Sequence, residues 1–188
     1  MASDVISMIK EDHRDVESLF ERLQKMPENR PALLAELAAK FVAHARAEER
    51  KIYPLLAKRR PDEKEEVHHG EDEHHEAEEI LAQLLAADPD GPEFDTVLQE
   101  LISAVSHHVE EEETEILPAL EKAVPPDERA KLGKVFSRLK AEELQTPPKP
   151  RQRSKEELLR AAEEAGVEGR SSMSKEELLT AIKAAKQS

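Results

Sequence analysis

This chain contains the segment His108-Val109-Glu110-Glu111-Glu112-Glu113-Thr114-Glu115-Ile116-Leu117-Pro118 and, earlier, its counterpart His44-Ala45-Arg46-Ala47-Glu48-Glu49-Arg50-Lys51-Ile52-Tyr53-Pro54. Each copy has a His, a Glu four residues later and a Pro ten residues after the His. Residues four apart lie on one face of an α-helix. Each copy therefore predicts a helix that presents an imidazole beside a carboxylate. The two prolines either end these helices or kink them.

Apolar residues around both segments recur every three or four positions, as in an amphipathic helix. The His–Glu pairs fall inside these apolar series, which are Leu34, Leu37, Phe41, His44, Glu48, Ile52 and Leu55, and then Leu98, Leu101, Val105, His108, Glu112, Ile116 and Ala119. Two polar side chains are thus expected on the buried face of each helix.

A further helix is expected before each of these two, and each carries one His in its apolar series. His13 lies between Ile9 and Val16 in the first, which Ser3 or Asp4 caps. His74 lies in the third, three residues before Ala77. The repeat unit is therefore a helical hairpin, and two hairpins make an all-α four-helix bundle. A fifth, shorter helix is expected from 127 to about 143.

The composition of the 188 residues favours helices and excludes several classes of protein. Aromatic residues make up 3% of the chain, and charged residues 37%. The net charge of -14 argues against a general nucleic-acid or anionic-membrane binder. Cysteine is absent, so a metal site must use nitrogen and oxygen ligands. No signal peptide and no apolar run of membrane-spanning length is visible, so a cytoplasmic protein is expected.

Six polar residues at matching depths of four successive helices predict a metal site. A single His on an apolar stripe is usually a hydrogen-bonded core residue. Here four His and two Glu share the expected core, and an unpaired buried carboxylate costs several kcal/mol. A bound cation removes that cost. The expected ligands are His13, His44, Glu48, His74, His108 and Glu112.

The composition of this ligand set narrows the choice of metal. A tetrahedral zinc site takes four ligands, and six are too many. Calcium and magnesium prefer oxygen and do not suit four imidazoles. Two iron ions bridged by Glu48 and Glu112 use all six residues, and mixed nitrogen and oxygen ligands also suit manganese. Iron is the preferred hypothesis because the set is rich in imidazole.

His13, His44-x-x-x-Glu48, His74 and His108-x-x-x-Glu112, with a proline after each His–Glu pair, resemble the hemerythrin-like family, the His-His-Glu cation-binding domain. The resemblance covers residues 1 to about 125. It implies an up-down-up-down bundle around a non-haem diiron centre with an oxo or hydroxo bridge. Members of the family bind dioxygen or react with peroxide or nitric oxide, and some sense oxygen or iron.

One position departs from the oxygen-carrying members of that family, which have two His four residues apart on the third helix. The residue four before His74 is Gly70, and the residue four after is Glu78. Glu78 is therefore a candidate additional ligand, with Glu71 or His75 as alternatives. Tyr53, the single tyrosine, either packs in the core or reaches the metal as a phenolate. A more carboxylate-rich site favours peroxide or redox chemistry, or sensing, over reversible oxygen carriage.

The C-terminal part has its own repeat after the proline-rich linker Thr146-Pro147-Pro148-Lys149-Pro150. Ser154-Lys155-Glu156-Glu157-Leu158-Leu159 recurs as Ser174-Lys175-Glu176-Glu177-Leu178-Leu179, and each Ser starts a capping box. This part resembles the small helix–extended–helix module at the N-terminus of transcription terminator Rho. That resemblance implies a nucleic-acid partner, and a small docking or dimerising helical pair is the alternative.

The expected domains are a diiron bundle at 1–145, a linker at 146–153 and a small helical module at 154–188. The leading functional hypothesis is a centre that binds or reacts with dioxygen, peroxide or related oxidants such as nitric oxide, with catalase-like activity left open. One alternative is an iron or oxygen sensor that acts through its C-terminal module on nucleic acid or protein. Another is iron binding or storage without turnover.

Overall fold

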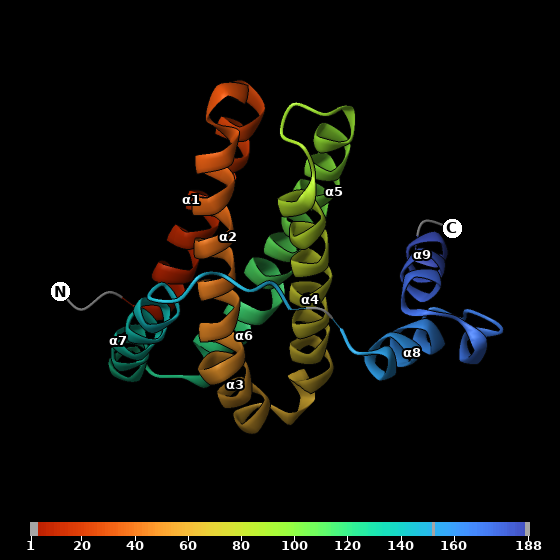
Figure 1. Ribbon diagram of the computed structural model, residues 1–188. Helices are drawn as coiled ribbons and strands as arrows, with labels where there is room; N and C mark the ends of the chain where they lie inside the picture. The colour runs from red at the N-terminus through yellow and green to blue at the C-terminus, as the bar shows by residue number, and fades with distance from the viewer. Residues whose placement is uncertain (1–3, 152, 187–188) are drawn as a thin grey trace. The chain divides into compact units, whose positions relative to one another are not determined.

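The computed structural model describes residues 4–151 and 153–186, and within them helices form the architecture (Figure 1). The bundle helices are α1 (Val5–Lys25), α2 (Arg30–Ala47), α3 (Tyr53–Arg59), α4 (Lys64–Ala86), α5 (Pro92–Glu111), α6 (Leu117–Ala123) and α7 (Pro126–Glu143). Short 3-10 helices lie between helices at Pro27–Asn29, Pro61–Glu63 and Arg170–Ser172. No strand occurs in the described ranges.

Four long rods run side by side, each antiparallel to the one before it (Figure 1). They are α1, α2 continued by α3, α4, and α5 continued by α6. Helix α1 packs on α2, α4 packs on α5, and α7 packs on both α1 and α2. The predicted up-down-up-down bundle with an extra helix is confirmed.

The first helix begins where the sequence predicts it. Asp4 is its N-cap, and its side chain accepts a hydrogen bond from the Ile6 backbone N–H at 3.0 Å. Ser3, the other candidate cap, lies outside the described residues. The buried positions of α1 follow the predicted spacing of three and four and include His13.

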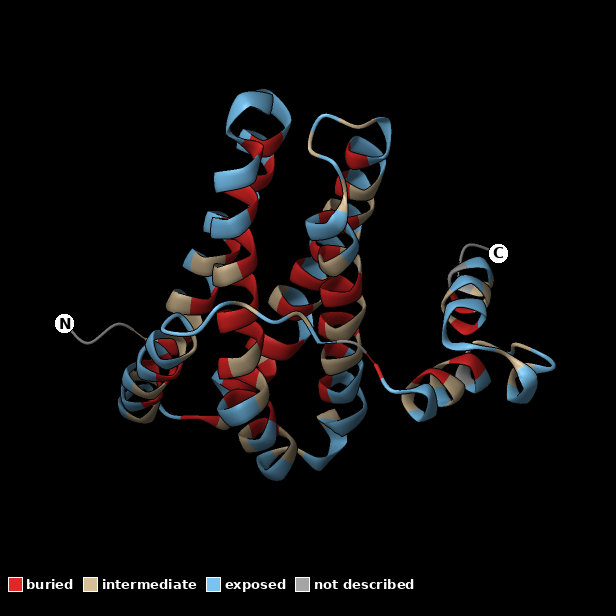
Figure 2. Ribbon diagram, viewed as in Figure 1, coloured by how far each residue is buried: buried red, intermediate tan, exposed pale blue. Residues whose placement is uncertain are grey.

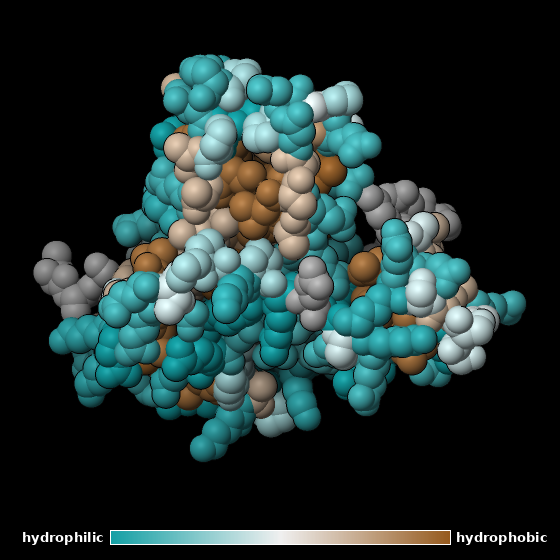
Figure 3. All heavy atoms as spheres, in the orientation of Figure 1, coloured by the Kyte–Doolittle hydropathy of each residue, from teal (hydrophilic) through white to brown (hydrophobic). Residues whose placement is uncertain are grey.

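Buried residues line the inward faces of the bundle helices (Figure 2). The apolar ones among them form two clusters, one on each side of a polar layer. In α1, Val16 belongs to one cluster and Ile9 to the other, and His13 lies between them. Val105 of α5 belongs to the first cluster, and Ile116, which follows α5, belongs to the second. The layer between the clusters holds the predicted ligands. The face of the molecule shown in Figure 3 is mostly hydrophilic.

The two prolines lie inside continuous helical rods. A π-helical turn precedes each one, η2 (Glu48–Ile52) before Pro54 and η4 (Glu112–Ile116) before Pro118. The idea that each proline ends its helix is wrong, because α3 and α6 continue beyond them. A wider turn relieves the clash between a proline ring and the carbonyl four residues earlier.

Arg151–Ser188 forms a second compact unit, separate from Met1–Pro150. It contains α8 (Lys155–Glu164) and α9 (Lys175–Lys186), and its residues 152, 187 and 188 lie outside the described ranges. Both predicted capping boxes form, because each Ser accepts from a Glu backbone N–H and that Glu side chain accepts from the Ser N–H. Leu158, Ala162, Leu178 and Ile182 make a small core. In the described part of the chain, none of the helices combines the length and apolarity needed to cross a membrane.

Candidate metal centre

The structure brings the side chains of all six predicted ligands together in the layer between the two apolar clusters. Their exposed fractions range from 0% to 5%, and they are His13, His44, Glu48, His74, His108 and Glu112. Ligand atoms of three overlapping trios lie within 4.8 Å of one another, and each trio is fully buried. The trios are His13 with His44 and Glu112, His44 with Glu48 and His74, and Glu48 with His108 and Glu112.

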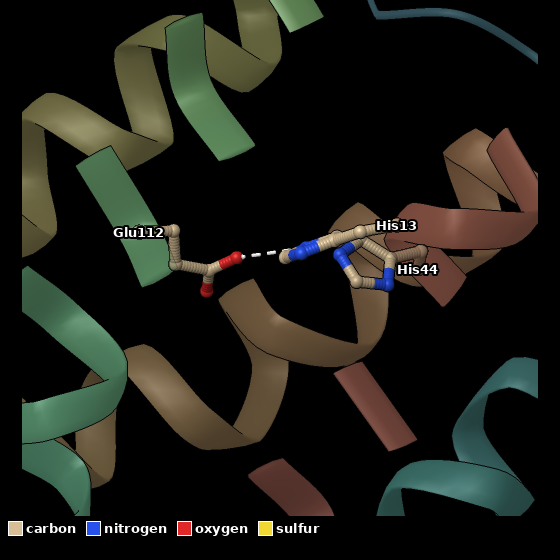
Figure 4. Close-up of side chains that lie close together, drawn as sticks. All are labelled: His13, His44 and Glu112. Carbon is tan, nitrogen blue, oxygen red and sulfur yellow. Dashed lines mark ion pairs between the residues drawn. The ribbon is translucent and has the colours of Figure 1, made fainter. Parts of the chain in front are cut away.

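The two carboxylates connect these trios. Glu48 Oε2 lies 3.1 Å from His44 Nε2 and 3.5 Å from His74 Nε2. Glu112 Oε2 lies 3.1 Å from His13 Nε2, the pair marked in Figure 4, and 3.9 Å from His108 Nε2. Each carboxylate thus faces two imidazoles through its Oε2 atom.

The π-helical turns begin at Glu48 and Glu112. The backbone N–H of Tyr53 donates to the Glu48 carbonyl, and that of Leu117 donates to the Glu112 carbonyl, five residues earlier in each case. Single π-helical turns inside α-helices occur frequently at functional sites. Here the turn is repeated with the same register in both halves of the bundle, so it belongs to the construction of the centre.

Carboxylates on the outside of the centre orient three of the imidazoles. His13 Nδ1 donates to Glu113 at 2.9 Å, His44 Nδ1 to Asp12 at 3.0 Å and His108 Nδ1 to Glu73 at 2.9 Å. An ionised carboxylate can only accept, so each Nδ1 carries a proton and each Nε2 faces inward. Metal-bound His residues show this outer contact almost always.

Sequence reasoning did not identify these outer carboxylates, because they lie off the apolar stripes and resemble solvated acidic residues. Their positions beside the ligands offered one signal: Asp12 precedes His13, and Glu113 follows Glu112. The fourth ligand imidazole has a looser contact, with His74 Nδ1 lying 3.5 Å from Glu49. Lys140 of α7 also pairs with Asp12, so α7 helps to hold the carboxylate that orients His44.

The inward-facing atoms lack hydrogen-bond partners in the part of the chain that the structure describes. They are Nε2 of His13, His44, His74 and His108, both carboxylate oxygens of Glu48, and Oε2 of Glu112. Buried polar atoms are nearly always hydrogen-bonded, and exceptions require an explanation. A set of lone pairs that converges without donors is explained by cations, so the residues fit a metal centre.

Electrostatics within the protein alone are unfavourable. Burial and the nearby Glu112 raise the pKa of Glu48 to about 7. Burial and the nearby His108 lower the pKa of His74 well below its ordinary value. Burial lowers the pKa of His44, but Glu48 and other carboxylates outweigh this and raise it to about 10. Metal binding needs neutral imidazoles and ionised carboxylates, and the cation supplies the missing positive charge.

Tyr53 occupies the space beside Gly70, the position that departs from the oxygen carriers. A Cβ at residue 70 would lie 3.1 Å from the Tyr53 hydroxyl and 3.2 Å from Ile116 Cδ1. The Tyr53 ring stacks on His74 at 5.6 Å between centroids, and its hydroxyl donates to Glu112 Oε1 at 3.4 Å. A phenol therefore takes the place beside His74 that a side chain at residue 70 would need.

We expect Gly70→Ala to destabilise the bundle by about 1 kcal/mol. Ala is the better helix former by about 1 kcal/mol, but overpacking a rigid core costs about 1–3 kcal/mol. Tyr53 is fully buried and cannot move aside. Urea unfolding of Gly70→Ala in the wild-type and Tyr53→Phe backgrounds checks this. The loss should shrink when the hydroxyl is absent, and an equal loss in both backgrounds would contradict the packing argument.

Glu78, the candidate additional ligand, lies against Arg46 of α2. Arg46 donates to the two Glu78 oxygens at 2.6 and 2.9 Å, and the Glu78 side chain is completely buried. The trios of ligand atoms in the described residues do not include it. Of the alternatives, Glu71 lies 3.7 Å from His68, and His75 lies 3.9 Å from Glu49.

We therefore expect Glu78→Gln to keep the full metal content of the protein. The variant should lose about 2 kcal/mol of unfolding free energy, because it weakens a buried ion pair with Arg46. Elemental analysis of the purified variant and its thermal unfolding curve provide the two readouts. Loss of one metal ion per chain would instead make Glu78 a ligand.

Comparisons with known proteins identify the family of this chain. The Hemerythrin model, described as the hemerythrin HHE cation-binding domain, matches residues 4–120. A protein named DNA nickase from Nostoc sp. (strain PCC 7120 / SAG 25.82 / UTEX 2576) is 29% identical over 120 residues, which are 62% of this chain and 33% of that protein. The chain thus spans about a third of that curated relative. No solved structure matches. Because the family model covers more than half of the chain and includes all six converging residues, the chain belongs to the hemerythrin HHE cation-binding family.

Proposed function

We propose that the centre holds two iron ions and that it binds or reacts with small oxidants, of which hydrogen peroxide, dioxygen and nitric oxide are the candidates. The carboxylates of Glu48 and Glu112 and the imidazoles of His13, His44, His74 and His108 would hold the ions. The observation that carries the proposal is the set of inward-facing nitrogen and oxygen atoms without hydrogen-bond partners among the described residues. Bound iron supplies the redox chemistry.

The protein itself encloses the centre with buried aromatic rings and with acidic side chains. Glu48, His74 and Glu112 are completely buried, and Phe41 and Phe136 place their ring edges against His74 and His44. The outer carboxylates raise the basicity of the imidazoles that donate to them. The more basic imidazoles favour the oxidised metal and hence redox turnover over reversible oxygen carriage.

Tyr53 is the one buried hydroxyl in contact with a bridging carboxylate that the described contacts show. Burial, followed by the nearby Glu112, raises its pKa well above the ordinary value, so the phenol keeps its proton. It therefore remains a hydrogen-bond donor at the edge of the centre, beside Gly70.

Oxygen release from hydrogen peroxide by the iron-loaded protein, followed with an oxygen electrode, tests this reaction class. His74→Ala is the inactive control, and Glu78→Gln is the control that keeps the centre. Release that depends on His74 supports peroxide turnover. If peroxide, dioxygen and nitric oxide all leave the optical spectrum of the iron-loaded protein unchanged, the proposal fails and iron storage without turnover replaces it.

A second candidate is a regulator whose C-terminal unit binds nucleic acid. One observation favours it: the curated relative is named a DNA nickase, although the chain covers only 33% of that protein. Comparison of the full chain with a version ending before Thr146, in a fluorescence polarisation assay with labelled DNA and RNA, tests it. Binding that disappears on truncation supports the regulator, and equal or absent binding of both versions contradicts it.

A further inference from the structure

A second set of His-x-x-x-Glu pairs lies near the surface, outside the buried centre. His69 and Glu73 are four residues apart on α4, and His107 and Glu111 are four residues apart on α5. The two helices pack directly on each other. Each pair therefore repeats the spacing of the buried ligands. His107 and Glu111 precede His108 and Glu112 by one residue, which turns them to a neighbouring face of the same helix.

Ligand atoms of His69, Glu73 and Glu111 lie within 4.8 Å of one another, and His107 contacts both carboxylates. His69 Nε2 lies 3.3 Å from Glu111 Oε2 and 3.8 Å from Glu73 Oε1. His107 Nε2 lies 3.2 Å from Glu111 Oε1 and 3.7 Å from Glu73 Oε1. Ligands bound to one cation at about 2.0–2.1 Å with tetrahedral geometry lie roughly 3.3–3.4 Å apart. The spacing of the His69, Glu73 and Glu111 atoms is close to that of a single coordination shell, and His107 lies beside them as a fourth ligand candidate.

Glu73 holds a fixed position between this cluster and the buried centre. Its exposed fraction is 9%, and its Oε2 accepts a hydrogen bond from His108 Nδ1 at 2.9 Å. The other oxygen, Oε1, faces His69 and His107. One ligand is thus preorganised by the core, which lowers the ordering cost of a site that otherwise consists of half-exposed side chains.

We propose that His69, Glu73, His107 and Glu111 form an outer site for one divalent transition-metal cation, zinc or ferrous iron. Two imidazoles and two carboxylates match the ligand preferences of these ions, whereas calcium and magnesium prefer oxygen alone. The imidazoles are half-exposed or more, with 50% and 62% of their side-chain surface accessible, so the ion exchanges with solvent. The outer site does not depend on which metal fills the buried centre.

The shared carboxylate connects the two sites. A cation on Glu73 Oε1 withdraws electron density from the same carboxylate that accepts from His108 Nδ1. Occupation of the outer site therefore weakens the basicity of one imidazole of the buried centre. The outer site also holds a metal ion near the surface, on His107 and Glu111, which adjoin the buried ligands His108 and Glu112 in the sequence.

Isothermal titration of the metal-stripped full chain with zinc tests the proposal. The wild-type protein should bind about one zinc ion more per chain than His69→Ala/His107→Ala, or bind that ion at least 10-fold more tightly. The matched control is His68→Ala, which removes an exposed imidazole next to His69 and should leave the titration unchanged. His74→Ala, which damages the buried centre, should keep the outer event.

The outcomes separate the outer site from the proposed function. Loss of an event in His69→Ala/His107→Ala but not in His68→Ala establishes the outer site, whatever His74→Ala does to the buried one. Identical titrations of wild type and His69→Ala/His107→Ala would overturn it. An equal loss in His68→Ala would also overturn it, because binding would then reflect loose attraction to surface imidazoles.

Discussion

Ferrous iron added without oxygen to the metal-stripped protein is expected to raise the midpoint of thermal unfolding of the bundle by about 10 °C. An ion that binds only the folded state adds about 4 kcal/mol when its free concentration is about 1,000 times its dissociation constant. For a chain of about this size, 1 kcal/mol shifts the midpoint by about 2–4 °C. The shift arises because the unfolded chain cannot assemble ligands from α1, α2, α4 and α5.

Circular dichroism at 222 nm during heating follows helix loss and provides the measurement. Magnesium at the same concentration is the control, because it does not suit an imidazole-rich centre. A midpoint that moves equally with both cations, or with neither, would contradict a specific buried centre.

Glu48→Gln should change stability in opposite directions in the metal-free and the metal-loaded protein. Burial and Glu112 raise the pKa of Glu48 from 4.5 to about 7. The folded protein therefore retains a proton that the unfolded chain releases between these values, and its stability falls as pH rises through about 7. At pH 8 the metal-free wild type carries a buried charge on Glu48 that is repelled by Glu112, and Gln removes this repulsion.

We therefore expect metal-free Glu48→Gln at pH 8 to melt at or above the wild-type temperature. With iron, wild type should gain the shift of about 10 °C, and the variant should gain little of it because a bridging carboxylate is lost. Glu110→Gln, an exposed change in the same acidic run as Glu112, is the matched control and should behave as wild type. A variant that is less stable than wild type without metal, yet stabilised equally by iron, would refute the account.

The repeat and its periodicity predict most of the bundle because the chemistry lies on the stripes that form the core. His44 and Glu48 interrupt an apolar series where a structural residue would be expected, so their role can be read from spacing. The same reasoning extends to His13 and His74, since the two hairpins match. Tertiary structure places them at one depth between two apolar clusters.

The remaining features depend on contacts between helices that periodicity does not encode. Asp12 and Glu73 lie off the stripes, and their roles follow from the packing of α1 on α2 and of α4 on α5. The π-helical turns cannot be read from the prolines alone, because a proline equally fits a helix end. Glu78 occupies a stripe-like position, but a long side chain from α2, Arg46, reaches it.

The metal content and optical spectrum of the purified protein test the central claim most directly. Wild type, reconstituted with iron, should contain about two iron ions per chain in the buried centre and show oxo-to-iron absorption in the near ultraviolet. His74→Ala should lose both, and His69→Ala/His107→Ala should keep the spectrum. A single metal ion per chain without that absorption, or a spectrum unchanged in His74→Ala, would contradict a diiron centre held by these six residues.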